Sequence, residues 1–347
     1  MSERRKVQLT GGSTFIVSLP INWVRGAGLE AGDSVILAPQ NKSSLLISSD
    51  TLNKNQRYET KIEINRLIPK KGKMYNQPPV AEPEDIFRIL ISHYLAGYDI
   101  IKMESKEGFS AADRKFIKDA SRKRLVGLEV VEESHHELVL QSLLNYRDLS
   151  LHRAMQNMSG LLTSMLSDIM EAIEKNDKEV AQDIILRDNE IDRFYLLTVR
   201  QLKAAIEDRN LSEKIGIERP RECLGYRLVT KSMERIGDHV VRIAKNLIEM
   251  ENEVEPDDPV FKMAEDVQTI FKQSMALLSN LDPMEANMVI KNAKKISLEG
   301  TALYKNRQAN TNSHQFGFIV ESLQRIAEYS GDIAEISINM STKDLNT

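Results

Sequence analysis

The sequence predicts a multidomain protein: a β-rich N-terminal region, a small α/β middle unit, and an all-α C-terminal body of tandem three-helix bundles. Short apolar runs separated by glycine turns fill residues 1–50, and strand-like and helix-like patterns alternate over residues 51–149. Beyond them, apolar residues recur at helical spacing, and one pattern returns 90 residues later. The expected parts are 1–50, 51–149, 150–255 and 256–342.

The composition is that of an ordinary soluble globular protein. Of 347 residues, 41% are apolar and 28% charged, while few aromatics (5%) and 14 Met favour helical packing. The lone Cys223 excludes an intrachain disulfide framework. No apolar stretch reaches the roughly 18 residues of a membrane-spanning helix, and the basic start MSERRKVQLT leads into no signal-peptide core. We therefore expect a cytoplasmic protein without membrane insertion.

The charge is distributed unevenly along the chain. The first 75 residues contain 12 Lys and Arg against 6 Asp and Glu, a balance of +6, whereas the remainder contains 35 against 45, a balance of −10. This asymmetry suggests that only the N-terminal region meets a polyanion. Ordinary scatter of a few charges between small domains is the alternative explanation.

Residues 1–50 predict the order β-β-α-β-β. Gly11-Gly12 tolerates positive φ and joins two short strands, and Pro20 begins a short helix that ends at Gly26. Two more strands follow, at 34–37 and 45–48. Four strands this short cannot bury much surface alone, so we expect a second copy to cover them and to duplicate the basic cluster Arg4-Arg5-Lys6.

The run RKVQLTGGSTFIVSLPINWVRGAGLEAGDSVIL resembles the AbrB/MazE/SpoVT swapped-hairpin domain over residues 4–48. The resemblance implies an interleaved, dimeric β-barrel that binds double-stranded DNA. It also implies that four basic residues face the phosphates: Arg4, Arg5, Lys6 and Arg25. Phosphate neutralisation with counterion release supplies most of such affinity. A pure dimerisation module with a solvated basic strand remains the alternative.

The middle region predicts a small α/β unit. Strands are expected at 58–67, 98–103, 128–131 and 137–140, and helices at 84–95 and 110–124. The region contains no glycine-rich phosphate loop, nucleophile elbow or metal-ligand spacing, and His135-His136 is expected in a solvated turn. A spacer, a ligand pocket and a second dimer contact all remain open as its role.

The body predicts six helices in two repeats. A first helix ends at Asn176-Asp177, a second runs over 180–207, and a third over 222–251. The segment VTKSMERIGDHVVRIAKNL at 229–247 aligns with IVESLQRIAEYSGDIAEIS at 319–337. Segments 261–278 and 284–308 supply the other two helices of the second bundle.

Two carboxylate pairs lie on the second and third helices of the first repeat. Asp188 and Asp192 are four residues apart, as are Glu234 and Asp238, so each pair occupies one helix face. Such pairs on neighbouring helices can converge on a hard or borderline cation. Alternatively these carboxylates form solvated helix faces, or Glu234-Arg235 and Asp238 form ion pairs with Arg187 or Arg193 that only hold the bundle together.

Residues 150–342 resemble the PhoU family of phosphate-signalling regulators. The motifs are Asp188-Asn-Glu-Ile-Asp192 and Glu234-Arg-Ile-Gly-Asp238-His239, followed by Ile243-Ala244. The resemblance implies a divalent or iron-type metal ion on these faces, and restraint of phosphate uptake through contacts with a phosphate ABC transporter or signalling components.

The second repeat departs from this pattern. Gln324 and Glu328 replace the acids of the third helix, and Ala293 and Ser297 align with the other pair, so a second site is weak or absent. His239 is expected to pack rather than ligate a metal, and Cys223 to lie in the core.

Together the two resemblances predict a cytoplasmic, homodimeric, DNA-binding regulator of phosphate uptake and homeostasis that is not an enzyme. Its body would sense metal, phosphate or a partner and bias the DNA-binding region. The first rival is an adaptor that does not bind DNA and docks a transporter ATPase or kinase. The second is a metal-dependent phosphohydrolase. Against the latter, the sequence offers no candidate nucleophile, positioned His base or glycine-rich phosphate cradle.

Overall fold

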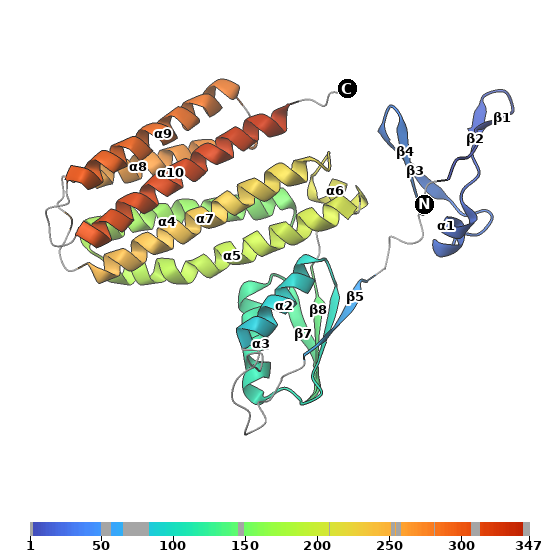
Figure 1. Ribbon diagram of the computed structural model, residues 1–347, viewed down its shortest axis with the longest axis horizontal. Coiled ribbons are helices and arrows are strands. Elements are labelled where there is room, and N and C mark those ends of the chain that lie inside the picture. The colour runs from blue at the N-terminus through green and yellow to red at the C-terminus, as the bar shows by residue number, and fades with distance from the viewer. Residues whose placement is uncertain are drawn as a thin grey trace, which may run out of the picture. The chain divides into compact units, whose positions relative to one another are not determined.

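The structure is a computed structural model that describes residues 3–49, 57–64, 83–144, 149–207, 209–250, 254, 258–280, 282–306 and 313–342. It divides into a small unit that ends at Arg57 and a large unit from Tyr58 to Thr342 (Figure 1). The large unit contains both the α/β part and the helical body. The predicted division into four parts stays a prediction.

The small unit has the predicted order of elements. These are β1 (Gln8–Thr10), β2 (Thr14–Ile16), α1 (Ile21–Gly26), β3 (Val35–Asn41) and β4 (Ser44–Ser49). Strands β1 and β2 form one antiparallel hairpin, and β3 and β4 another. Gly11 and Gly12 have φ of 62° and 80°, which only glycine adopts freely, so the first turn depends on them.

The two hairpins remain separate two-stranded sheets, and one chain forms no closed barrel over the described residues. The apolar side chains of these strands face solvent: Phe15 is 71% and Leu9 59% exposed. Ala27 is the buried apolar residue in the described part of this unit. A domain without its own core needs a covering partner, and the interleaved dimeric barrel stays the prediction for it.

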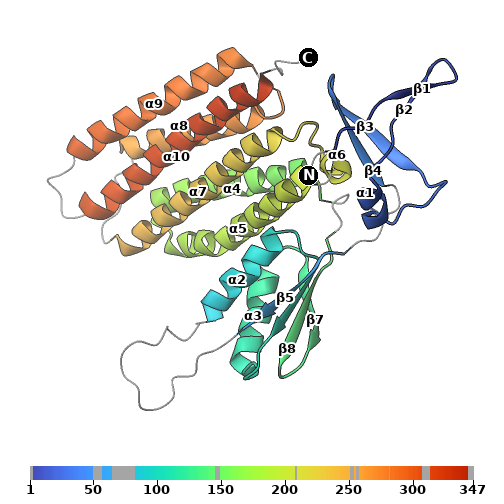
Figure 2. The ribbon, with the colours of Figure 1, turned by 45° about the vertical axis from the view of Figure 1, so that its right-hand side comes forward.

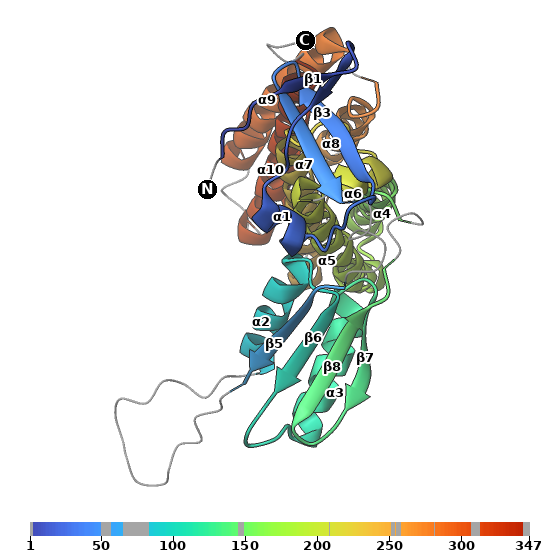
Figure 3. The same ribbon diagram turned by 90° about the vertical axis from the view of Figure 1, so that its right-hand side faces the viewer.

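The α/β part of the large unit confirms the predicted succession of elements. It consists of β5 (Glu59–Glu63), α2 (Pro83–Leu95), β6 (Ile100–Glu104), α3 (Ala111–Arg124), β7 (Leu128–Glu133) and β8 (Glu137–Ser142). The sheet order is β5-β6-β8-β7, with β5 and β6 parallel and the other pairs antiparallel. Helices α2 and α3 cover one face around Phe87, Ile101 and Leu140 (Figure 3).

The helical body contains both expected bundles. The first is α4 (Leu151–Lys175), α5 (Lys178–Glu207) and α7 (Glu222–Glu249), and the second is α8 (Pro259–Ala276), α9 (Pro283–Asn306) and α10 (Ser313–Ser341). Asn176, at φ 50°, ends α4, and the Asp177 carboxylate accepts a hydrogen bond from the Glu179 backbone N–H at 3.0 Å to cap α5. The short helix α6 (Arg209–Ile215) was not predicted. None of the described helices is long and apolar enough to cross a membrane.

The two bundles pack against each other through their third helices, α7 and α10, which lie side by side (Figure 2). Arg242 pairs with Glu321 at 3.0 Å across this seam. The His239 ring packs on the Tyr329 ring of α10, with ring centroids 5.9 Å apart, which agrees with the packing role expected for His239. Cys223 is buried in the shared core, which confirms its predicted place.

A buried arginine attaches the α/β part to the first bundle. Arg200 on α5 has no solvent exposure and donates to the Tyr98 carbonyl oxygen at 2.9 Å and to the Gly97 carbonyl oxygen at 3.1 Å. It also donates to the Tyr94 carbonyl oxygen and pairs with the Asp99 carboxylate at 3.1 Å. A buried charge with this many partners fixes the C-terminal end of α2 on α5. We call this contact the Arg200 latch.

Candidate functional site

The four carboxylates singled out in the sequence lie on the adjoining helices α5 and α7; we call Asp188, Asp192, Glu234 and Asp238 the carboxylate cluster. Gly237 allows the two helices to approach closely here. A Cβ placed at Gly237 would meet Asp188 Oδ1 at 3.1 Å and an Ile191 methyl at 3.3 Å. Asp188 therefore lies across the α7 backbone, beside the residue that precedes Asp238.

The cluster concentrates negative charge in a partly buried place. Burial raises the pKa of Asp188 to about 7, and the other three carboxylates contribute. Desolvation, followed by the charges of Glu234 and Asp192, raises the pKa of Asp238 to about 6. Burial and Glu234 likewise raise the pKa of Asp192. Burial and neighbouring carboxylates thus disfavour the charged forms of Asp188, Asp192 and Asp238, and a bound cation would relieve this.

Arg187 and Arg193, the arginines considered as ion-pair partners of the cluster, pair with other carboxylates. Arg187 pairs with Asp168 at 2.7 Å and with Asp183 at 2.8 Å. Arg193 pairs with Glu190 at 2.9 Å. Within the cluster, Glu234 pairs with Lys231 one turn earlier on α7. In the structure, Arg187 and Arg193 therefore do not form the ion pairs with Glu234 and Asp238 that the alternative interpretation expects.

The chemistry of the donor set is that of a hard-cation site, because all four groups supply carboxylate oxygens. As placed, no three His, Cys, Asp or Glu side chains in the described ranges surround a common point where a metal could sit. The donor type and the charge fit a cation, and metal binding stays a prediction.

The corresponding place in the second repeat keeps one of the four carboxylates, Glu328, beside neutral groups. Ser297 Oγ on α9 donates to Glu328 Oε1 at 2.9 Å, and Gln324 Nε2 donates to Thr301 Oγ1 at 3.0 Å. A cavity of about 440 Å³ lies here, with Ala293 in its wall. Glu299 lines a different cavity, beside Asp266. Ala293, Ser297 and Gln324 therefore stand where the first repeat has Asp188, Asp192 and Glu234, and only the position of Asp238 keeps a carboxylate, Glu328.

The raised pKa values predict how the metal-free fold responds to pH. A carboxyl whose pKa is higher in the folded than in the unfolded chain stabilises the fold at low pH and loses this contribution as pH rises through the folded value. For Asp188 this window runs from about 4 to about 7. With metal removed by chelator, we expect the free energy of unfolding to fall by on the order of 1–2 kcal/mol as pH rises through this window. This figure allows for solvent screening, because Asp188 is partly exposed. Thermal melts at pH values at both ends of the window should show a smaller loss of stability for Asp188→Asn than for wild type. Equal losses in the two proteins would contradict this prediction.

The four basic residues proposed for DNA contact are all exposed. Arg4, Arg5 and Lys6 precede β1 on extended chain, where Arg5 bonds Glu3. Arg25 occupies the last turn of α1. Three of these side chains therefore lie in the segment before β1 and one lies on α1, and all four are open to solvent.

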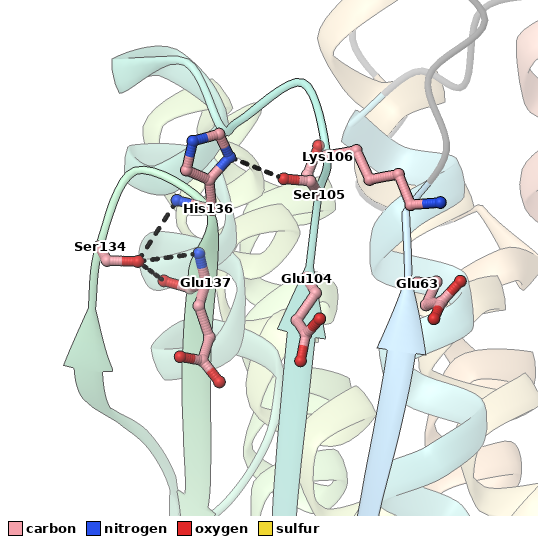
Figure 4. A pocket seen from close by; sticks show the side chains of 7 residues that line it. All are labelled: Glu63, Glu104, Ser105, Lys106, Ser134, His136 and Glu137. Atoms are coloured by element: carbon pink, nitrogen blue, oxygen red, sulfur yellow. Dashed lines mark hydrogen bonds between the residues drawn. The ribbon is translucent and has the colours of Figure 1, made fainter.

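The α/β part has a surface hollow of about 380 Å³ at one end of its sheet (Figure 4). Glu63, Glu104 and Glu137 extend from neighbouring strands, and Lys61 pairs with Glu104 at 2.7 Å. The His136 Nδ1 and the Ser105 carbonyl oxygen are 3.0 Å apart. His135 and His136 are exposed in the turn between β7 and β8, as predicted. The glutamates do not point toward one another in Figure 4, so no donor set forms.

The Arg200 latch was not predicted from the sequence. A usable signal existed, because Arg200 and Gln201 interrupt the apolar run from Leu196 to Leu202, and a charge inside such a run implies buried partners. The sequence pattern does not identify those partners, because they lie about 100 residues earlier in the chain.

Comparison with known proteins finds two families along the chain. Residues 155–247 match the PhoU domain. Residues 8–51 match the family described as "Antidote-toxin recognition MazE, bacterial antitoxin".

Similar proteins include three described as a phosphate-specific transport system accessory protein PhoU homolog. That of Streptococcus pneumoniae serotype 4 is 28% identical over 225 residues, covering 58% of this chain and 97% of the relative. That of Clostridium acetobutylicum is 26% identical over 206 residues, covering 55% and 91%. That of Caulobacter vibrioides is 31% identical over 97 residues, covering 28% and 39%.

Two crystal structures of PhoU proteins are also similar. The phosphate transport system regulatory protein PhoU from Streptococcus pneumoniae has a TM-score of 0.45 at 23% identity, covering 57% of this chain and 98% of that one. PhoU from Pseudomonas aeruginosa has a TM-score of 0.43 at 20% identity, covering 55% and 94%. The matches in sequence confirm both resemblances noted above: to the PhoU family in the helical body, and to the MazE/AbrB type in the small N-terminal unit.

Proposed function

We propose that this chain is a cytoplasmic, DNA-binding regulator of phosphate uptake and homeostasis, and not an enzyme. In this proposal the small unit dimerises and binds duplex DNA, and the helical body responds to a cation, to phosphate or to a component of a phosphate transporter. The observation that carries it is the union of two matches in one chain: a MazE-type unit at 8–51 and a PhoU domain at 155–247.

Dimerisation and DNA contact are supported by what the small unit exposes. Its strands present Leu9, Phe15 and Leu37 to solvent, and a second copy of the unit would cover them. The dimer would carry two sets of Arg4, Arg5, Lys6 and Arg25, which are about eight phosphate-facing charges at most.

Cation binding is supported by the carboxylate cluster. Asp188, Asp192, Glu234 and Asp238 would hold a divalent cation, and the ion would supply charge neutralisation rather than a reaction. Each of these carboxylates has neighbours of the same sign, so binding an ion would favour their charged forms and stabilise the packing of α5 against α7.

The first test removes two charges from the lead strand. Arg4→Ala with Arg5→Ala takes up to four positive charges from the dimer. We expect weaker binding to duplex DNA, by at least about tenfold near 0.1 M salt, and a log K against log salt slope flattened by up to about 3.6, since each phosphate contact contributes about 0.9. Fluorescence anisotropy across a salt series measures both quantities.

A matched control carries the same charge change outside the small unit. Arg88→Ala with Arg122→Ala alters two exposed arginines of the α/β part and should leave affinity and slope unchanged. Size-exclusion chromatography should show the same oligomer for all three proteins. If the lead-strand variant kept the wild-type affinity and slope, the adaptor function without DNA binding would replace this proposal.

A second test concerns the dimer itself. Phe15→Asp places a charge on a strand face that is exposed in one chain and covered in the proposed dimer. A buried, unpaired carboxylate is costly, so we expect the variant to be monomeric at micromolar concentration and to lose DNA binding with it. Sedimentation equilibrium measures the state; an unchanged dimer would show that this face is not the interface.

A further inference from the structure

The second helices of the two repeats, α5 and α9, have different neighbours. In the first repeat, α2, α3 and α6 contact α5, and Leu196 of α5 packs against the core of the α/β part. In the second repeat, the helices packed along α9 within the described part of the chain are α8 and α10. The outer side of α9 carries Met284, Met288 and Leu298, and Leu298 is 72% exposed. The second repeat therefore leaves uncovered a helix whose counterpart in the first repeat is covered.

The cavity of about 440 Å³ between α9 and α10 is an open groove with an apolar floor. Ile290 and Ala293 of α9 line it, and Gly331 of α10 has no side chain to fill it. A Cβ at Gly331 would lie 3.2 Å from the Ala293 Cβ, so the two helices approach closely at the floor. Leu298 lines the same groove at its rim. We call this feature the α9/α10 groove.

The two helices that border the α9/α10 groove carry opposite charges. Lys294 of α9 and both Asp332 and Glu335 of α10 line the groove, and Lys291 lies one turn before Lys294. None of these four side chains forms an ion pair with another described residue. Burial, followed by the charges of Glu335 and Glu328, raises the pKa of Asp332. A positive charge brought to this side of the groove from outside would therefore be favourable.

The register of α9 and α10 places these opposite charges at matching levels. The hydrogen bond from Ser297 to Glu328 sets the register of the two antiparallel helices, which lie side by side (Figure 2). Three residues back along α9 therefore correspond to three residues forward along α10. By this register each unpaired lysine of α9 is within one residue of the level of an unpaired carboxylate of α10: Lys294 with Asp332, and Lys291 with Glu335.

We infer that the α9/α10 groove is an interface for a second copy of this chain, related to the first by a two-fold axis along the groove. A half-turn about such an axis leaves every level unchanged and places α9 of each copy over α10 of the other. Lys294 and Lys291 then face Asp332 and Glu335 of the second copy, and the two Leu298 side chains meet over the apolar floor. Opposite charges face each other throughout, so this surface is complementary to itself.

The contact is small and its ion pairs are exposed, so we expect it to be weak by itself. It forms mainly between copies that are already joined through their small units, where the effective concentration of one body near the other is on the order of millimolar. This last step rests on the small-unit dimer proposed above, whereas the interface itself does not.

The test is disulfide cross-linking of full-length Leu298→Cys under mild oxidation, at about 10 and about 500 μM chain. Wild type provides the baseline, because its single cysteine, Cys223, is buried. Leu186→Cys is the matched control, because Leu186 is similarly exposed (69%) on α5, the counterpart of α9. We expect Leu298→Cys to form the intermolecular disulfide at least about tenfold faster than Leu186→Cys, since the bond requires the two side chains to meet.

Charge variants of the Leu298→Cys chain show whether the ion pairs join two copies. Lys294→Glu or Asp332→Lys alone places like charges opposite each other twice in the dimer, so each should slow cross-linking by about tenfold. An equilibrated equimolar mixture of the two variants should restore the rate, because each chain then offers the charge that the other needs. A charge effect within one chain cannot give this recovery, and its absence would overturn the two-fold arrangement.

The two concentrations separate this interface from the small-unit dimer. Equal rates for Leu298→Cys and Leu186→Cys at both concentrations would overturn the interface. Cross-linking of Leu298→Cys at the higher concentration alone would support the interface and would count against the small-unit dimer, which should hold the bodies together at the lower concentration as well.

Discussion

Replacing Arg200 with Met is expected to destabilise the large unit by about 3–5 kcal/mol, which is the usual cost of breaking a buried ion pair by removing one partner. Met has a similar length and no charge, so the main loss is electrostatic. The carbonyl oxygens of Tyr94, Gly97 and Tyr98 would lose the guanidinium that they share, and the Asp99 carboxylate would lose its pairing with Arg200. Chemical denaturation followed by circular dichroism measures the change.

Arg193→Met provides the matched control on the same helix. Arg193 pairs with Glu190 at the partly exposed surface, so its replacement should cost less than about 1 kcal/mol. Arg200→Lys should fall between the two, because an ammonium keeps the charge but cannot reach as many acceptors at once. Equal stability of Arg200→Met and Arg193→Met would show that the α/β part is not held through Arg200.

Asp192→Asn with Asp238→Asn is expected to remove most of the metal bound by the purified chain. A multiply charged cation needs convergent carboxylates, and this variant leaves one on each helix, Asp188 and Glu234. Glu328→Gln should remove little, because its surroundings in the second repeat are the Ser297 hydroxyl and Arg325. Mass spectrometry of protein purified without chelator measures the metal content, and equal content in wild type and the double variant would eliminate the site.

The same double variant distinguishes a cation site from structural ion pairs. In chelator, it should melt at the same temperature as wild type or higher, because it relieves repulsion among groups whose pKa values are raised. A much lower melting temperature would show that these carboxylates serve nearby cations as structural partners.

Much of the fold was predictable from local signals. The helical period sets α4, α5 and α7, and Asn176-Asp177 and Pro283 mark breaks that the structure confirms. The alignment of 229–247 with 319–337 predicts a second bundle, and the structure has it as α8, α9 and α10. Helix α6 was missed, since seven residues between two long helices carry too short a pattern to separate from a loop.

The sites were predictable to different extents. The spacing of Asp188 with Asp192 and of Glu234 with Asp238 predicts which helix faces carry charge, because it depends only on the helical period. The partners of Arg200 depend on tertiary packing between segments far apart in sequence, so the charge inside an apolar run indicates that Arg200 has buried partners but not which groups they are. The closure of the small unit into a barrel depends on a second chain, so neither the sequence pattern nor the structure of one chain contains it.

The central claim is that one chain binds DNA through its small unit and that the helical body modulates this binding. The most direct test is the affinity of the wild-type chain for a random duplex of about 30 base pairs, measured by anisotropy from about 50 to about 300 mM salt, with and without Mn²⁺. We predict a linear fall of log K with log salt, with a slope steeper than about −3, and a shift of K when Mn²⁺ is present. No salt-dependent binding under either condition would contradict the claim.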